Sequence, residues 1–250
     1  DPTRGISARG IIGLRLNTSA STLLNGDYVQ IMNGASFELG QNSLTYFLSF
    51  NSDFIRLDKT TKTFVNVEVI QGEKADQSFT GTGLALQSYN LTTKDPTDQY
   101  LVDVFVDGEL WKKVESLYDM NNGTKAVMVK TSVNGGLSVF FGNNQFGLPP
   151  ALGSRIRVTY VITRGNAGNV GGKQLDIKFA TPGTDSSGEQ VDLNEILSMN
   201  ITRNPMFGSD SEDPAFTRLI APYASNSFVL ANPNNYIYYL SKYDFWSFID

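Results

Sequence analysis

Residues 137–172 read LSVFFGNNQFGLPPALGSRIRVTYVITRGNAGNVGG, and this stretch carries the most informative strand and turn signals of the chain. It predicts two strands joined by a long, stiff connection. The first, Leu137 to Phe141, is short, apolar and β-prone. The second, residues 155–163, alternates polar and apolar side chains and then becomes continuously apolar. We therefore expect the second strand to be half buried at its start and more deeply buried towards its end.

Glycine and proline define the rest of this stretch. Gly142 and Gly147 are expected to adopt backbone angles closed to other residues, and Pro149-Pro150 stiffens the crossing between the strands. Past Thr163, glycines make a continued strand unfavourable and allow the backbone to approach another segment closely. They are Gly165, Gly168, Gly171 and Gly172.

Working outward, the same signals recur along the chain. Residues 102–106 and 110–114 flank Asp107-Gly108, the best short hairpin signal present. A second hairpin is predicted around Val133-Asn134-Gly135-Gly136, and Phe64 to Ile70 alternates as a strand does. Earlier β-prone runs, separated by Asn-Gly turns, predict an antiparallel sheet. They cover residues 9–16, 28–32 and 44–50.

These patterns predict a mainly β protein, built as an antiparallel sandwich or as open-barrel-like sheets, with a few short helices toward the C-terminus. We expect an N-terminal β segment over 1–63, a central β domain over 64–180 and a mixed α/β segment over 181–250. Residues 191–201 fit either a strand or a short helix. A Ser or Asp cap, early acidic residues and Pro214 predict a helix from 209 to about 221. The chain starts without methionine, so it is expected to be trimmed or to be part of a longer protein.

An aromatic segment closes the chain, with seven aromatic residues among the fourteen from 236 to 249. On a helix, one stripe would hold Tyr236, Tyr239, Tyr243 and Trp246 with Leu240, while Tyr238, Phe245 and Ile249 would lie on nearly the opposite side. A helix that is apolar on two sides needs two surfaces to pack against. We predict a subunit interface formed by Tyr236, Tyr239, Tyr243, Phe245 and Trp246; packing within the chain's own core is the open alternative.

Composition excludes several function classes. The absence of cysteine removes thiol catalysis and disulfides, and the absence of histidine removes the Ser-His-Asp relay and imidazole metal sites. A net charge of -5 with scattered Lys and Arg argues against nucleic acid as a partner. No apolar run is long enough to span a bilayer. We expect no catalytic residue, no cofactor, no bound metal and no small-molecule substrate.

Carboxylates could form two kinds of site in this chain. Asp210, Glu212 and Asp213 have the oxygens that Ca²⁺ prefers, but acidic residues at a helix start are favoured by the helix dipole without any ion. A glycosidase would need two carboxylates facing each other across a cleft, and no local motif nominates such a pair. Trp111, close to the Asp107-Gly108 turn, is predicted to be a core or hairpin anchor.

The order of these features resembles the baseplate J-like family of contractile phage tails, which includes the wedge protein of T-even-type baseplates. The resemblance covers about residues 65–172. Its marks are Val69 to Glu73, Phe105 to Gly108 with Trp111, Phe140 to Gly142 with Phe146-Gly147, Pro149-Pro150 with Gly153-Ser154, Val158 to Tyr160, and Gly168 to Val170. As structural motif residues it marks Gly142, Phe146, Gly147, Pro150, Gly153, Tyr160, Gly168 and Asn169.

The resemblance implies a structural component of the baseplate wedge. Such a protein would join copies of itself and other wedge proteins in a ring around the tail hub, and would relay the change that triggers sheath contraction. Its location would be the tail baseplate of the virion, assembled in the host cytoplasm; related secretion and toxin-injection machines use similar proteins. A carbohydrate- or receptor-binding β-module of a tail fibre or adhesin is the alternative, and a histidine-free glycosidase is a second rival.

Overall fold

Strands dominate the computed structural model, which describes residues 5–210 apart from 41–42, 94, 132–135 and 172–175. The mainly β prediction is confirmed: the described residues form three curled sheets with two four-residue α-helices. Residues 5–210 constitute one compact unit.

A six-stranded sheet and a four-stranded sheet enclose the first core. The six-stranded sheet has the order β14 (Ile177–Phe179), β3 (Ser36–Leu39), β4 (Thr45–Ser49), β6 (Val65–Gln71), β1 (Arg9–Leu16) and β17 (Leu197–Met206). The four-stranded sheet has the order β16 (Gln190–Val191), β15 (Gly183–Asp185), β2 (Tyr28–Met32) and β5 (Phe54–Asp58). The predicted strands over 9–16, 28–32 and 44–50 are therefore present as β1, β2 and β4.

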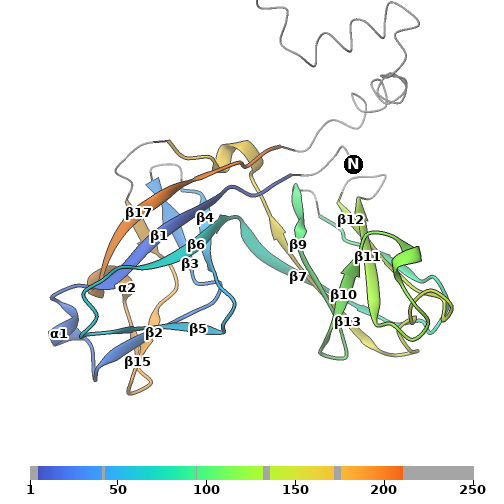
Figure 1. Ribbon diagram of the computed structural model, residues 1–250, viewed down its shortest axis with the longest axis horizontal. Helices are drawn as coiled ribbons and strands as arrows, with labels where there is room; N and C mark the ends of the chain where they lie inside the picture. The colour runs from blue at the N-terminus through green and yellow to red at the C-terminus, as the bar shows by residue number, and fades with distance from the viewer. Residues whose placement is uncertain (1–4, 41–42, 94, 132–135, 172–175, 211–250) are drawn as a thin grey trace, which may run out of the picture. The chain divides into compact units, whose positions relative to one another are not determined.

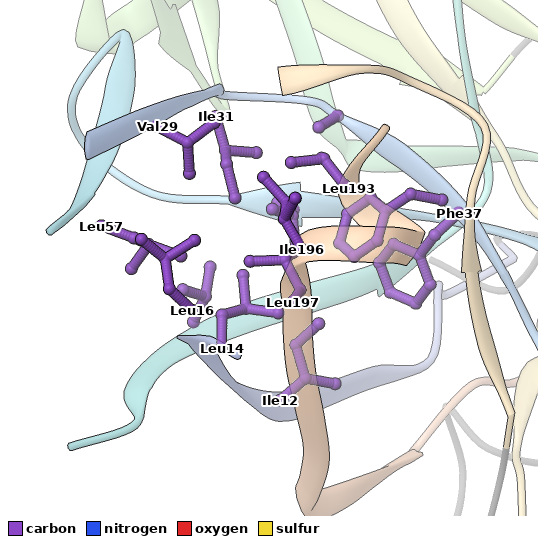
Figure 2. Close-up of a cluster of buried hydrophobic side chains, with 14 of the residues drawn as sticks. Ile12, Leu14, Leu16, Val29, Ile31, Phe37, Leu57, Leu193, Ile196 and Leu197 are labelled. Atoms are coloured by element: carbon purple, nitrogen blue, oxygen red, sulfur yellow. The ribbon is translucent and has the colours of Figure 1, made fainter. Parts of the chain in front are cut away.

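The first core forms because alternate residues of these strands are apolar and point inward. Figure 2 shows Ile12, Leu14 and Leu16 of β1 directed toward side chains of β2 and of the short helix α2 (Leu193–Ile196). Ile12 and Leu14 are completely buried. Burying a side chain of this size contributes about 1.5–3 kcal/mol, so this cluster is a main source of the unit's stability.

A seven-stranded sheet curls around the second core. Its order is β7 (Glu73–Thr80), β13 (Arg155–Ile162), β9 (Thr97–Val106), β10 (Glu109–Val114), β11 (Ala126–Thr131), β12 (Leu137–Phe141) and β8 (Ser88–Asn90). β13 is alternately exposed and buried at its start and more fully buried near its end, as predicted. Trp111 is 5% exposed and packs edge-on against Phe141, which confirms its role as a core anchor.

Both predicted hairpins are present, and one strand pair departs from the antiparallel expectation. Asp107 (φ 51°) and Gly108 (φ 86°) form the turn between β9 and β10, with the two positive angles that a tight hairpin turn requires. β11 and β12 pair antiparallel. β10 and β11, however, pair in parallel, because the connection through the short 3-10 helix η2 (Leu117–Asp119) crosses back before β11 starts.

The two cores are linked by one long strand, since β6 of the six-stranded sheet runs on into β7 of the seven-stranded sheet (Figure 1). Gly72 separates them with φ 142°. A Cβ atom there would lie 2.4 Å from Val161 Cγ1 and 2.6 Å from the Ile162 carbonyl oxygen, so only glycine lets the strands cross. A third apolar cluster, formed by Phe47, Ile70 and Val161, lies at this crossing.

Sheet membership does not follow the predicted boundaries at residues 63 and 180. β6 was assigned to the central domain but pairs with β1 and β4, and β14 to β17 pair with N-terminal strands. The alternation that predicts a strand does not identify its partner, so strand positions were predictable and sheet membership was not.

The C-terminal half resolves one open interpretation and leaves another outside the described residues. Residues 191–201, predicted as strand or helix, contain both: α2 covers 193–196, and β17 starts directly after it at Leu197. The helix predicted over 209–221 begins where the description ends. The helix α1 (Ala20–Leu23), which lies before β2, was not predicted.

The first and last described segments pair with each other. The Ile6 amide donates to the Ser209 carbonyl at 2.9 Å, and the Ser209 amide donates to the Ile6 carbonyl at 3.0 Å. Nearby, the buried Asp98 carboxylate accepts from the Ser7 and Tyr100 amides, both at 2.9 Å. These bonds fix both segments to the start of β9.

Candidate functional site

The motif residues Gly142, Phe146 and Gly147 form one tight loop after β12. The Asn143 amide donates to the Phe146 carbonyl and the Asn144 amide to the Gly147 carbonyl. Gly147 has φ 70°, as predicted. For Gly142 the prediction of an unusual angle was wrong; glycine is needed there because a Cβ atom would lie 2.1 Å from the Phe146 carbonyl oxygen.

Pro150 and Gly153 shape the connection into β13. The Pro150 carbonyl accepts from Gln87 Nε2 at 2.8 Å, and the Gly153 amide donates to the Gly81 carbonyl at 2.9 Å. Gly153 has φ 83°. Tyr160, further along β13, is 5% exposed in the second core, and its hydroxyl accepts from Gln77 Nε2 at 3.1 Å. These three motif residues hold loops and strands together.

Gly168 belongs to a buried network centred on Gln71. Gln71 Oε1 accepts from Thr163 Oγ1 at 3.0 Å and from the Arg164 amide at 2.8 Å. Gly168 lies against the Gln71 side chain, and its carbonyl accepts from the Tyr46 hydroxyl at 2.8 Å. Burial raises the pKa of Tyr46 to about 12. The network joins the end of β13 to β4 and β6.

Asn169 fixes the last described segment. Its Nδ2 donates to the Gly208 carbonyl at 2.8 Å and its Oδ1 accepts from the Gly208 amide at 2.7 Å. Gly165, in the 3-10 helix η3 (Gly165–Gly168), lies so close to Ser209 and Asp210 that a Cβ atom would collide with both. The expected close approach of the glycine-rich exit is thus confirmed for Gly165 and Gly168, while Gly171 has no described atom near its missing Cβ and Gly172 lies outside the described residues.

The predicted interface residues lie outside the described residues. This applies to Tyr236, Tyr239, Tyr243, Phe245 and Trp246. Of the acidic residues near the predicted helix start, only Asp210 is described. Its Oδ1 accepts from the Asn166 amide at 2.8 Å.

A groove that sequence reasoning missed lies between the outer face of β7-β13-β9 and residues of β4 and β6. Its volume is about 410 Å³. The apolar part of its lining includes the cluster of Phe47, Ile70 and Val161, with Leu101, Ala75 and Phe105. The polar part combines charged and hydroxyl groups from both sides of the crossing. These are Asn33, Ser49, Lys74, Asp76, Asp103, Arg157 and Thr159.

Strand register explains how these charges meet. Thr159 of β13 pairs with Asp76 of β7 on one side and with Asp103 of β9 on the other. Since neighbouring strands are about 4.8 Å apart, the two aspartate Cα atoms are separated by roughly 10 Å. Arg157 lies two residues before Thr159 and shares its face of the sheet. Three strands distant in sequence contribute the charges, so no local motif signals them.

The two cations of the groove are held by aromatic rings. Lys74 Nζ lies 4.8 Å from the centre of the Phe47 ring, and Arg157 Cζ lies 4.9 Å from the centre of the Phe105 ring. Lys74 is exposed along one side, yet the surrounding protein lowers its pKa by desolvation, and the charge of Asp103 opposes that shift. Within the described part of the chain, no hydrogen bond or ion pair occupies the charged ends of Lys74, Asp76, Asp103 or Arg157.

The groove contains two carboxylates, as a glycosidase site would. Asp76 and Asp103 lie in one groove, which is the arrangement that the glycosidase hypothesis requires, so that hypothesis stays a prediction. The described residues contain no group of three or more acidic side chains that could hold a metal ion. Among their helices, none has the length and apolar character needed to cross a bilayer.

No protein-family model and no curated protein matches the chain.

Proposed function

We propose that this chain is a structural, non-enzymatic component of the baseplate wedge of a contractile tail. It would join copies of itself and other wedge proteins in the ring around the tail hub, and so belong to the virion. Rearranging those subunit contacts would release sheath contraction.

One observation carries the proposal: several residues that define the family resemblance hold loops closed or connect strands of different sheets. Gly142 and Gly147 close the loop after β12, while Gly168 and Asn169 connect β13 to the six-stranded sheet and to the segment around Gly208. A subunit that transmits a conformational change to adjacent subunits needs rigid connections of this kind between its sheets and loops. The position of the motif residues at such connections supports a mechanical role.

The predicted subunit interface supplies the first test. We expect the purified chain to form a concentration-dependent dimer or larger species, measured by light scattering behind a sizing column. Replacing Tyr239 and Trp246 together by Ala should weaken this assembly far more than it weakens folding, since large aromatic residues contribute most to interface energy.

A matched control removes two exposed aromatics elsewhere. Tyr100 is 62% exposed and Tyr118 is 85% exposed, so replacing both by Ala should leave the oligomeric state seen by light scattering unchanged. If the Tyr239/Trp246 variant instead unfolds as a monomer, those side chains are core residues and the interface prediction is wrong.

Location supplies a second, independent test. In immunogold electron microscopy, antibodies raised against residues 5–210 should label contractile-tailed particles that contain this protein. The label should lie at the baseplate end of the tail. Label on tail fibres, or on no particle at all, would contradict the proposal.

The carbohydrate- or receptor-binding alternative has one observation in its favour, the charged groove. A binding module predicts a glycan-dependent rise in thermal stability, whereas a scaffold alone predicts none. We also expect no hydrolysis of any glycan, which chromatography of the incubated sugar would check.

A further inference from the structure

The groove between β4, β6 and the outer face of β7-β13-β9 has unused hydrogen-bonding capacity. Carboxylates only accept hydrogen bonds, and ammonium and guanidinium groups only donate them. Asp76 and Asp103 supply the acceptors, while Lys74 and Arg157 supply the donors. The rings of Phe47 and Phe105 hold the two cations in place through their faces, and the N–H groups that do not face a ring stay available.

The charge of this lining is balanced. Two carboxylates and two cations sum to zero, and the charges of Lys74 and Asp103 attract each other. A lining with no net charge does not concentrate polyanions or polycations, so nucleic acid and acidic polymers are poor candidates for this groove. The matching ligand is uncharged overall and carries groups that both donate and accept hydrogen bonds.

The dimensions suit a short ligand. A volume of about 410 Å³ lies within the range of small-molecule sites. Leu101, which is partly exposed and packs on the cluster of Phe47, Ile70 and Val161, adds an apolar surface on which the carbon side of a ring can rest. Hydroxyl and amide groups of Ser49, Thr159 and Asn33 complete the polar part of the lining.

We propose that this groove binds a short, neutral oligosaccharide. Sugar hydroxyls would donate to Asp76 and Asp103 and accept from Lys74 and Arg157, which meets every requirement of the lining with one repeated chemical group. The proposal is independent of the baseplate assignment, because it uses no residue beyond Asp210 and no subunit contact.

A glycan microarray carrying neutral, sialylated and sulfated oligosaccharides tests it. Wild-type protein should bind neutral glycans, and calorimetry with the strongest neutral binder gives the dissociation constant. Asp76→Asn and Asp103→Asn keep the side-chain shape and remove one charge-assisted acceptor each. Each should weaken binding about tenfold or more.

Glu115→Gln is the matched control, since Glu115 is an exposed carboxylate of the same unit outside the groove. It should bind like wild type, and all three variants should keep the wild-type melting temperature. Binding to no neutral glycan, preference for sialylated or sulfated glycans, or equal affinity of the aspartate variants and wild type would each overturn the proposal. The mass and labelling experiments on the baseplate assignment would be unaffected by any of these results.

Discussion

Gln71 illustrates how a single buried side chain joins two sheets. It is 2% exposed and accepts hydrogen bonds from Thr163 Oγ1 and from the Arg164 amide. Replacing it by Ala leaves those donors without a partner and opens a cavity beside Gly168. We expect Gln71→Ala to lower the free energy of unfolding by about 2–4 kcal/mol, measured by urea denaturation.

The control for this change is Gln145→Ala, because Gln145 is exposed and its side chain makes no hydrogen bond within the described residues. Its effect should stay within about 0.5 kcal/mol. If the two substitutions lowered the free energy of unfolding equally, the hydrogen bonds of Gln71 would make no measurable contribution to stability.

Tyr46 makes the stability depend on alkaline pH. Burial raises its pKa from 10.0 to about 12, so the unfolded chain loses this proton at lower pH than the folded protein does. Its contribution to stability is complete below pH 10 and is lost as the pH rises toward 12. Tyr46→Phe should therefore show a smaller loss of stability over this range, measured by denaturation at a series of pH values. A pH dependence identical to that of the wild type would contradict this prediction.

These two residues also show what a sequence does not reveal. Gln71 lies in the motif Val69 to Glu73 and Tyr46 lies in a predicted strand, but neither pattern indicates their hydrogen-bond partners, which lie 92 and 122 positions away in the chain. Gly147, in contrast, was predictable, since it follows a short strand and needs a positive φ that glycine adopts at no cost.

At the scale of elements, three glycines form a graded series. Among the described residues, Gly171 has no positive φ and no atom near its missing Cβ, Gly108 has φ 86° with open space, and Gly142 would place a Cβ 2.1 Å from a carbonyl oxygen. Substitution by Ala should cost within about 0.5 kcal/mol at Gly171, about 1–2 at Gly108 and about 3 or more at Gly142. Thermal unfolding of the three variants ranks them. A different order would mean that loop rearrangement relieves the collision at Gly142.

Elements were predictable from local pattern, and their partners were not. The hairpin at Asp107-Gly108 depends on neighbouring residues, so the sequence alone predicts it. The parallel pairing of β10 with β11, and the membership of β6 in the six-stranded sheet, depend on distant segments. The helix-or-strand ambiguity at 191–201 arose because a turn of helix directly precedes a strand.

At the scale of the whole 5–210 unit, the run of β6 into β7 predicts that both cores unfold in one transition. β6 and β7 are continuous, and the Gln71 network and the crossing cluster connect the two larger cores. We expect Leu48→Ala in the first core and Leu137→Ala in the second to destabilise the same calorimetric transition, by about 2–5 kcal/mol each. Two transitions, each moved by only one of the substitutions, would show that the cores unfold independently.

The charged groove belongs to this largest scale as well. Its charges come from Lys74 and Asp76, from Asp103 and from Arg157, and only the order of strands β7, β13 and β9 brings them together. No spacing within the sequence encodes that order. The presence of Asp76 and Asp103 in one groove was therefore not predictable from the sequence.

The mutual hydrogen bonds of Ile6 and Ser209 have a practical consequence for protein engineering. Because the two ends of the unit leave it side by side, residues 5–210 can be grafted into a surface loop of a carrier protein without stretching either chain. Such a chimera would carry the unit as an inserted domain, joined to the carrier by two adjacent chain segments. Fixing the ends together in the carrier would also reduce the freedom of the unfolded chain.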